Sequence, residues 1–456
     1  MSLSKATLAS AEDGNCCTRS RWKCLGKAIF WPLILLIQAI RIYFLGCILV
    51  YISRLGRGIL CGMCVCCHCT FKDKSFPHNH ISIGEWKDKT PAQIDSEVQW
   101  RRIADIVAAS SRTGAKLFAG RIEPSDICQG QLGDCWLMSA LACLANQDGA
   151  VQQIFVTKEY NAYGKYKVRL YDAPKEAWVT IAVDDWIPCG SNGLPIFAKP
   201  NGDEAWVLLL EKAMAKFKGS YARLDGGITM WALECLTGDF VFKFNMDSKT
   251  GKWKRFDIVH VPKAEAGGYD IRLKPSDDEL DSEEMFNSML FYNRKRSFIS
   301  ASSGSGTDTQ DVNGIVQGHA YAICNVKRVD RFQLVQLRNP WGTFEWKGNW
   351  SDLSSLWEEN PKVKRALDFK PADDGTFWME WKDFCEHYKS LDFCARTTGF
   401  EDISLDIHEE RPYCGPVLGC LEGCFRYWVC CLGVRALFFS RKSRHFEKPP
   451  TGCCAC

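Results

Sequence analysis

The longest apolar stretch of the chain covers residues 28–52, with Pro32, Gln38 and Arg41 as its main interruptions. The stretch is long enough to cross a bilayer, but an arginine near its middle is costly in a hydrocarbon environment. Basic residues flank it on both sides, so the charges do not indicate an orientation. We therefore favour an interfacial or re-entrant helix that leaves the rest of the chain at the cytosolic face of a membrane. A membrane span and a secretory signal peptide are the alternatives.

Three shorter patterns predict elements of a folded core. Residues 137–144 are apolar and follow a glycine-containing polar segment, which predicts the first turns of a buried helix. Residues 206–217 carry apolar side chains at helical spacing and should pack in the same core. The segment 318–323 is apolar after its glycine and histidine, and it predicts the beginning of a strand.

Charge is distributed unevenly along the chain, although its net value is only +3. Residues 1–70 carry eight Lys and Arg against two acidic residues, and residues 411–456 carry seven against two. The intervening stretch 71–410 is therefore acidic. An acidic middle argues against nucleic acid as a partner and fits divalent cations, whereas basic ends favour contact with anionic membrane lipids.

The 25 cysteines are concentrated at the two ends, with nine in 16–69, eight in 414–456 and eight between. A secreted disulfide scaffold would spread them through one small domain, so we expect a reducing compartment. Cysteines beside apolar and basic residues are typical sites of S-acylation. The candidates for this lipidation are Cys61, Cys64, Cys66, Cys67, Cys69, Cys453, Cys454 and Cys456. Zinc binding is the alternative for the first cluster, and a weak prenylation signal is the alternative for the second.

The segment 129–136, QGQLGDCW, contains the strongest candidate for chemistry. It places Cys135 at the start of the predicted helix, where unpaired N–H groups and the helix dipole favour a thiolate. Gln129 stands six residues upstream and can donate an N–H to an oxyanion formed beside the sulfur. A buried structural cysteine is the alternative interpretation when this segment is taken alone.

Two later residues favour the chemical interpretation. His319 opens the predicted strand, and Asn339 follows twenty residues later in the segment Asn-Pro-Trp-Gly. A nucleophilic cysteine needs a histidine as its base, and an asparagine side chain can accept from the imidazole and orient it. The order Gln, Cys, His, Asn therefore predicts a thiol protease.

These motifs resemble those of the calpain family of cysteine proteases over roughly residues 85–400. The matching segments are ICQGQLGDCW (127–136), VDDWIP (183–188), LLEKAMAKFKGSY (209–221), GHAYAI (318–323) and NPWGTFEWKGNWSD (339–352). The resemblance implies an α+β fold with two papain-like lobes and an active-site cleft between them. It also implies that the first lobe carries Cys135 and that the second carries His319 and Asn339.

The resemblance further implies a calcium-dependent intracellular endopeptidase that cleaves protein substrates at limited sites. Cys135 would be the nucleophile, His319 the proton acceptor, Asn339 its orienting partner and Gln129 an oxyanion donor. Trp341 matches a tryptophan that shields these groups and can block the cleft before calcium binds. No organic cofactor is expected.

Calpain lobes each bind one calcium ion, and carboxylate oxygens are suitable ligands for it. The residues at matching positions are Asp126, Glu211, Glu345, Asp352 and Asp374. The chain departs from the family at two further positions. Pro124 replaces a usual arginine and Thr376 replaces a usual glutamate, and these two form a salt bridge between the lobes in other members. Calcium binding is still expected here, but the lobes should be coupled differently.

The motifs also divide the chain. Residues 1–84 form a membrane-attachment segment and linker, with 71–95 expected to be exposed; 85–240 form the first lobe; 241–400 form the second; and 401–456 form a cysteine-rich basic tail. Cys135 and His319 lie further apart than is usual in calpains, which indicates an insertion near 245–295, expected to be a solvated loop or helix. No EF-hand pattern is present. The alternative functions are a non-catalytic membrane scaffold with a calpain-like fold and a transglutaminase-like acyl transferase.

Overall fold

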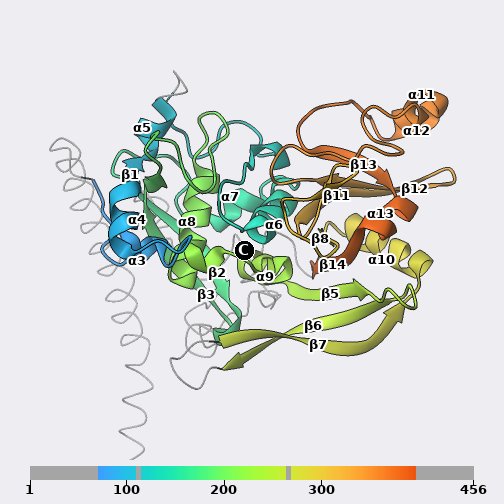
Figure 1. The fold of residues 1–456 in the computed structure, drawn as a ribbon, viewed down its shortest axis with the longest axis horizontal. Helices are drawn as coiled ribbons and strands as arrows, with labels where there is room; N and C mark the ends of the chain where they lie inside the picture. Colours follow the sequence, from blue (N-terminus) through green and yellow to red (C-terminus); the bar gives the residue numbers. More distant parts are fainter. Residues whose placement is uncertain (1–69, 109–113, 263–268, 397–456) are drawn as a thin grey trace, which may run out of the picture. The chain divides into compact units, whose positions relative to one another are not determined.

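The computed structural model describes residues 70–108, 114–262 and 269–396, all within one compact unit. Figure 1 shows a first part made mainly of helices, followed along the chain by a second part built on a large sheet. This mixture of helices and strands confirms the expected α+β class.

Short helices and hairpins surround two longer helices in the first part. The helices are α3 (His80–Ile83), α4 (Pro91–Glu97), α5 (Ile103–Ala108), α6 (Cys135–Ala145), α7 (Ala150–Ile154), α8 (Trp206–Lys218) and α9 (Thr229–Thr237). The strands are β1 (Gln99–Arg102), β2 (Lys165–Asp172), β3 (Ala177–Asp184) and β4 (Trp186–Cys189), and β1 pairs with β4 and β2 with β3, both antiparallel. Single 3₁₀ turns occur at η2 (Pro124–Asp126), η3 (Ala173–Lys175) and η4 (Ala222–Leu224).

The two helices predicted from apolar spacing are confirmed. Every residue of α6 after its first is buried, as expected for a helix that is apolar on all sides and crosses a core. Helix α8 is buried from Trp206 to Ala215. It ends at Gly219, whose φ of 108° is a left-handed conformation that glycine adopts without steric cost, and whose N–H donates to Ala215 O.

An antiparallel sheet of eight strands forms the second part. Its strands are β5 (Phe240–Met246), β6 (Trp253–Pro262), β7 (Tyr269–Leu280), β8 (Phe298–Ser303), β11 (Ala320–Val329), β12 (Phe332–Arg338), β13 (Thr376–Glu380) and β14 (Tyr388–Ala395), in the order β13-β12-β11-β8-β14-β5-β6-β7. Outside it lie the small pair β9 (Asp311–Val312) and β10 (Ile315–Val316) and the helices α10 (Ser282–Arg294), α11 (Leu356–Glu359), α12 (Pro361–Ala366) and α13 (Trp381–His387).

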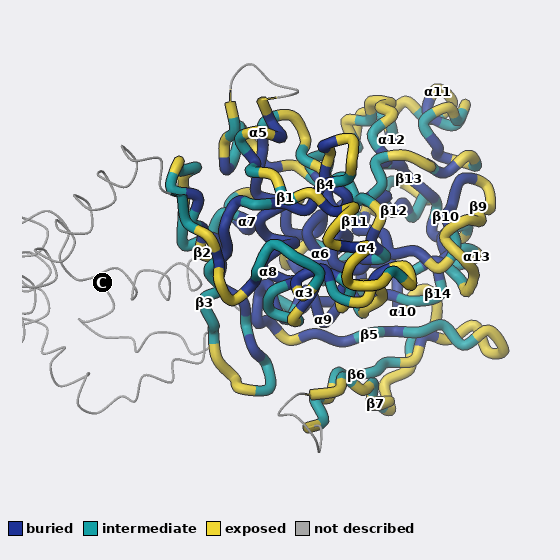
Figure 2. Tube along the Cα trace, turned by 60° about the vertical axis from the view of Figure 1, so that its left-hand side comes forward, coloured by how far each residue is buried: buried dark blue, intermediate teal, exposed yellow. Residues whose placement is uncertain are grey.

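The two faces of this sheet pack against different partners. Successive residues of a strand point to opposite faces, and along β11 Ala322 joins the core that contains α6, whereas Tyr321 and Ile323 join a second core. That second core also contains buried side chains of α10 and α13. Figure 2 shows the backbone of α6 and β11 as mostly buried, in contrast to β6 and β7. The sheet therefore brings the beginning of β11, which directly follows His319, close to α6.

The expectation that 71–95 is an exposed linker was wrong. Phe76, Ile83, Trp86 and Ile94 are at most 6% exposed and belong to the core of the first part. Apolar residues spaced irregularly over a short segment give no helical or strand periodicity, so their burial depends on the surface that α8 and its neighbours present.

The segment 245–295 is also more ordered than expected. Strands β6 and β7 form a long hairpin that extends the sheet. Helix α10 buries Met285, Phe286 and Met289 in the second core. The acidic residues 277–284 end β7 and begin α10. There Asp281 caps the helix by accepting from Glu284 N at 2.8 Å.

The apolar run 28–52 and the eight candidate acylation cysteines lie outside the described residues. Within the ranges that the structure describes, no helix combines the length and apolar character needed to cross a bilayer.

Candidate active site

Cys135 is the first residue of α6, the position that the sequence predicted. The loop before it lies tightly against a neighbouring segment, with Gln131 N donating to Ile196 O at 2.9 Å. Only glycine fits at position 130, because a Cβ there would come within 1.7 Å of Phe197 O. This close approach of two backbones fixes the beginning of α6 and with it the position of the cysteine.

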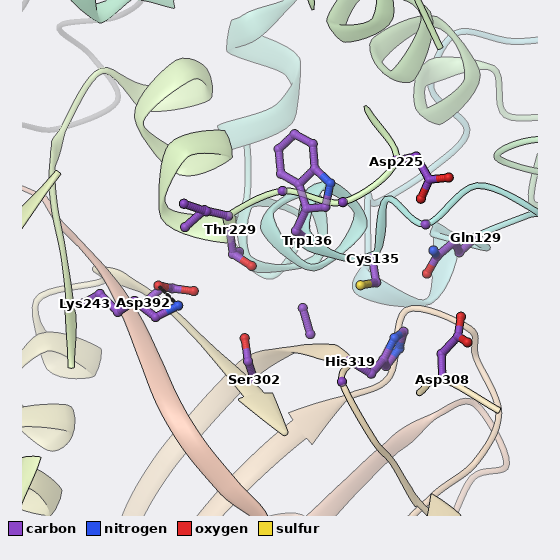
Figure 3. Close-up of a pocket in the computed structure, with 16 residues that line it drawn as sticks. Gln129, Cys135, Trp136, Asp225, Thr229, Lys243, Ser302, Asp308, His319 and Asp392 are labelled. Carbon is purple, nitrogen blue, oxygen red and sulfur yellow. Dashed lines mark ion pairs between the residues drawn. The ribbon is translucent and has the colours of Figure 1, made fainter. Parts of the chain in front are cut away.

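A cavity of about 260 Å³ lies beside the sulfur and has walls from both parts of the fold. His319 and Gln129 line it together with Cys135, and Figure 3 shows the imidazole of His319 next to the cysteine. A backbone group of Ala320, the first residue of β11, interacts with the thiol. The fold therefore brings together the cysteine and the histidine that the sequence singled out.

The backbone of His319 is anchored where β11 meets β8. Its N–H donates to Ser303 Oγ at 2.9 Å, and its carbonyl accepts from Ser303 N at 3.0 Å. The side chain is buried, with 2% of the residue exposed. Its Nε2 lies 2.9 Å from Asn339 Oδ1.

The surroundings of Asn339 determine which imidazole nitrogen carries the proton. Its Nδ2 donates to Thr343 O at 2.6 Å, so its Oδ1 must face the histidine as an acceptor. Oδ1 also accepts from Trp341 N at 3.1 Å. His319 Nε2 must then be the N–H donor of this contact, which leaves Nδ1 of a neutral imidazole free to accept the proton of a thiol.

Burial shifts both reacting groups towards their neutral forms. It raises the pKa of the Cys135 thiol to about 11, and the carboxylate of Asp134 adds to this shift. It lowers the pKa of His319 to about 4, although the hydrogen bond to Asn339 acts in the opposite direction. The arrangement seen here is therefore a thiol beside a neutral imidazole, and formation of a thiolate–imidazolium pair requires further stabilisation of both charges.

Gln129 lines the cavity but already makes one contact of its own. Its Nε2 donates to Leu132 O at 2.7 Å, while its Oε1 is buried without a hydrogen-bond partner in the structure. An amide nitrogen has two hydrogens, and the Gln129 side chain also forms a hydrogen bond with the carboxyl group of Asp134, which lowers the pKa of that group. The backbone N–H of Gln129 donates to Pro340 O at 3.3 Å, which ties this loop to the segment that carries Asn339.

Trp341 packs against the imidazole of His319, and the centroids of the two rings are 4.6 Å apart. Its position over the histidine is compatible with the shielding role predicted for it, which remains a prediction. Trp136, the residue after Cys135, is 3% exposed, and its Nε1 donates to Leu224 O.

The two candidate calcium ligands of the first part have different neighbours. Asp126 lies in η2 and accepts from Asn201 Nδ2 at 3.2 Å. The carboxylate beside it is that of Glu204, whose pKa is raised to about 7 by burial, with the charge of Asp126 adding to the shift. Glu204 was not among the candidates from the sequence, because the motif match gave weight to the Leu-Leu-Glu-Lys segment seven residues later.

Glu211, which the sequence suggested as a ligand, has different neighbours. It is 1% exposed and accepts from Ala198 N at 2.9 Å, and its other interaction is with the fully buried carboxyl group of Asp134. Burial raises the pKa of both carboxyl groups; Asp134 raises the pKa of Glu211 further, whereas the hydrogen bond with Glu211 lowers that of Asp134. Two buried carboxyl groups in contact favour sharing one proton over holding two negative charges. Glu211 therefore fits a buried acid pair better than a cation site.

The three candidate ligands of the second part lie in one loop region. Burial raises the pKa of Glu345 and of Asp352, and the neighbouring charge of Asp374 raises both further. Their oxygens accept from loop N–H groups, among them Gly375 N to Glu345 Oε1 at 2.7 Å and Ala372 N to Asp352 Oδ2 at 2.8 Å. Clustered carboxylates that repel one another suit a divalent cation.

In the arrangement that the described residues adopt, no three His, Cys, Asp or Glu side chains converge closely enough to hold a metal ion. The carboxylates of the second part thus match calcium in chemical type, while their oxygens are directed at the backbone of their own loop.

Arg338 connects the two parts near the positions where other calpains have a salt bridge. This arginine is 1% exposed, and its Nε donates to Pro124 O at 2.6 Å. Its other nitrogens donate to Ile127 O in the first part and to Asp374 O in the second. Backbone carbonyls of both parts thus accept the hydrogen bonds of this buried guanidinium. The contact does not depend on an arginine at position 124 or a glutamate at position 376.

Comparison with known proteins agrees with this geometry. A family model described as "Calpain family cysteine protease" matches residues 71–395. "Calpain-type cysteine protease DEK1" of Arabidopsis thaliana is 36% identical over 331 residues, which make up 71% of this chain and 14% of the plant protein. Human "Calpain-9" is 30% identical over 333 residues, 72% of this chain and 43% of the human protein.

The chain thus matches less than half of the length of either relative. The matched region, however, contains every residue that lines the cavity described above. Because the family match spans most of this chain, the protein belongs to the calpain family of cysteine proteases.

Proposed function

We propose that the protein is a calcium-dependent intracellular endopeptidase that cleaves protein substrates through an acyl-enzyme on Cys135. The observation that supports this most directly is the 2.9 Å contact between His319 Nε2 and Asn339 Oδ1, beside a cavity that also contains Cys135. It leaves Nδ1 of the imidazole as the base that a cysteine nucleophile requires.

In the proposed reaction, Cys135 Sγ attacks the carbonyl carbon of the scissile peptide bond while its proton passes to His319 Nδ1. The carbonyl oxygen becomes an oxyanion, for which a side-chain N–H of Gln129 and the backbone N–H of Cys135 are the proposed donors. The C–N bond then breaks as Nδ1–H protonates the leaving amine. Water attacks the resulting thioester, gives its proton to His319, and the acid product leaves as the thiol is restored.

The neutral state of the resting pair supports regulation of this reaction. The thiol pKa of about 11 and the imidazole pKa of about 4 favour the neutral form of each group at neutral pH. Calcium would supply positive charge to the repelling carboxylates of Glu345, Asp352 and Asp374. Arg338 donates to the backbone of Asp374 and of the first part, so movement of that loop would reach both lobes.

A covalent probe tests the proposal most directly. The purified full chain is treated with an epoxide peptide inhibitor at increasing calcium concentrations, and the labelled residue is identified by mass spectrometry. We expect labelling of Cys135 that rises with calcium, in parallel with cleavage of an unfolded protein substrate. Labelling and cleavage that are complete in excess chelator would contradict calcium dependence, and cleavage without labelling of Cys135 would contradict the mechanism.

We further propose that the two cysteine-rich ends hold the protease at the cytosolic face of a membrane. The support is the sequence alone: the apolar run 28–52, the basic flanks and the cysteine clusters of both ends. Hydroxylamine should release thioester-linked lipid from both clusters. Stoichiometric zinc in place of thioesters would leave only the apolar run as an anchor.

A further inference from the structure

Phe344 adopts a backbone conformation that a bulky residue rarely has. Its φ is 61°, in the left-handed region, where the Cβ of an L-residue crowds the following carbonyl oxygen. Trp350, six residues later in the same loop region, has a φ of 64°. Strained residues of this kind persist only where their surroundings stabilise them, and they are concentrated at functional sites. The contacts of each residue therefore indicate what maintains its conformation.

Burial accounts for the conformation of Trp350 but not for that of Phe344. The side chain of Trp350 is fully buried, with ring centroids 4.9 Å from Phe332 and 4.8 Å from Trp357, so the core holds this residue in place. Phe344 is 50% exposed, and its ring lies beside Trp341 with centroids 5.8 Å apart. A half-exposed side chain gains little from packing, so another interaction must stabilise the turn at Phe344.

The backbone of this turn is bound to Asn339. Asn339 Nδ2 donates to Thr343 O at 2.6 Å and to Phe344 O at 3.3 Å. Successive carbonyls of an extended chain point in opposite directions, so two of them reach one amide only where the backbone turns. Gly342, with a φ of 70°, begins this turn, and its N–H donates to Asn339 O at 2.9 Å. The left-handed conformation of Phe344 thus helps to bring both carbonyls to the amide.

The two carbonyls determine which way the Asn339 amide faces. Oδ1 accepts from Trp341 N at 3.1 Å and lies 2.9 Å from His319 Nε2. If the amide were rotated by half a turn, Oδ1 would face two carbonyl oxygens and Nδ2 would face the N–H of Trp341. Such an arrangement leaves buried polar atoms without partners, which is costly. The turn therefore keeps an acceptor directed at the imidazole.

We infer that Phe344 is a positioning residue of the proposed endopeptidase, on which this inference rests. Its left-handed backbone holds two carbonyls against Asn339 Nδ2, and Asn339 in turn orients the imidazole of His319 for proton transfer. Phe344 does not line the active-site cavity and acts through Asn339. Residues that accept a positive φ at this position should preserve the function, and residues that exclude it should impair the function.

Backbone substitutions in the full chain test this role. Variants are assayed with activating calcium against a peptide substrate, after circular dichroism has confirmed that they fold. Phe344→Pro fixes φ near −65° and should lower kcat by about tenfold or more, with KM within about twofold of wild type, because only the orientation of reacting groups is lost. Phe344→Gly and Phe344→Asn accept a positive φ and should retain kcat within about threefold.

Asp330→Pro is the matched control for a disturbed turn. Asp330 is exposed and has a φ of 51° in the turn between β11 and β12, at the opposite end of β12 from Asn339. It does not line the cavity. The same backbone change at this position should therefore leave kcat at the wild-type value.

A double-mutant cycle separates positioning from a general structural disturbance. The amide is absent in Asn339→Ala, so adding Phe344→Pro to that variant should lower kcat no further. An independent structural effect would instead multiply the loss. Multiplied losses would overturn the inference, as would wild-type kcat in a folded Phe344→Pro variant or an equal loss in Phe344→Gly.

The inference and the proposed function fail in distinguishable ways. If the protein is no cysteine endopeptidase, wild type shows neither epoxide labelling nor cleavage. If only the role of Phe344 is wrong, wild type is labelled and cleaves its substrate, while the Phe344 variants give one of the contrary results above. Should Phe344→Pro fail to fold, Phe344→Ile decides the outcome, because a β-branched side chain disfavours a positive φ. Its kcat should fall by about threefold or more, and wild-type kcat would overturn the inference.

Discussion

The two parts of the active site hold their reacting groups by different means. Cys135 begins a helix, and burial together with the neighbouring carboxyl group of Asp134 disfavours its thiolate. His319 precedes a strand and is held by the neutral groups of Ser303 and Asn339. The first part therefore controls how readily the thiol ionises, and the second controls how the imidazole is oriented.

Removal of either reacting group is the strongest test of this division. Cys135→Ala or His319→Ala should abolish both epoxide labelling and peptide hydrolysis without changing the circular dichroism spectrum, because each variant removes a bond-forming or proton-accepting atom. Cys385→Ala is the control, since this half-buried cysteine lies on α13, away from the cavity. Hydrolysis by Cys135→Ala would end the proposed mechanism.

Loss of orientation should cost less than loss of the base itself. Asn339→Ala should lower kcat by roughly 10²-fold, at the lower end of general acid–base effects, with little change in KM. Asn339 contacts the imidazole and the loop carbonyls, so a thermal melt is needed beside the kinetics. A kcat equal to that of wild type would show that Ser303 and the packing of Trp341 suffice to orient His319.

The carboxylates of the two parts should respond differently to substitution. Glu345→Ala combined with Asp352→Ala should raise the calcium concentration for half-maximal activity by about tenfold or more, or remove activity, because two ligands are lost. Glu204→Gln should also raise it. Glu211→Gln should leave the calcium response unchanged, because its carboxyl group interacts with Asp134 instead. A calcium response altered only by Glu211→Gln would restore the original ligand assignment.

The pH dependence of alkylation separates the two electrostatic environments. Without calcium, the thiol pKa of about 11 lies above neutral pH, so the thiolate fraction and the iodoacetamide rate at Cys135 should rise about tenfold per pH unit from pH 7 to 10. A thiolate paired with imidazolium would instead react at a constant rate above about pH 5. Calcium should shift the profile towards that second form, and a flat profile without calcium would contradict the neutral resting pair.

The smallest expected effect concerns a contact between the parts. His260 on β6 lies 2.9 Å from Glu234 Oε2 on α9, with side chains 14% and 12% exposed. His260→Ala should lower the free energy of unfolding by about 1 kcal/mol, as for a single partly buried pair. Chemical denaturation measures this change. Lys252→Ala, which disrupts only an exposed pair within the hairpin, should have a smaller effect.

Local sequence patterns were sufficient to predict the elements whose formation depends on residues close together in the chain. Apolar spacing identified α6 and α8, and the motif order identified the cysteine, the histidine and the asparagine that the fold brings to one cavity. The buried segment 71–95 and the hairpin β6–β7 were not recognised. The apolar residues of 71–95 follow no clear period, and their burial comes from distant partners.

The sequence by itself determined the family, the helix that presents Cys135, and the residue types available for catalysis, because these depend on side-chain chemistry and short-range spacing. Only the tertiary structure decided that Glu204 lies beside Asp126, that Glu211 shares a buried site with Asp134, and that Lys243 faces Asp392. The physical reason is that the role of a carboxylate depends on its burial and on its nearest charges. Those are set by strand register and helix packing between residues far apart in the chain.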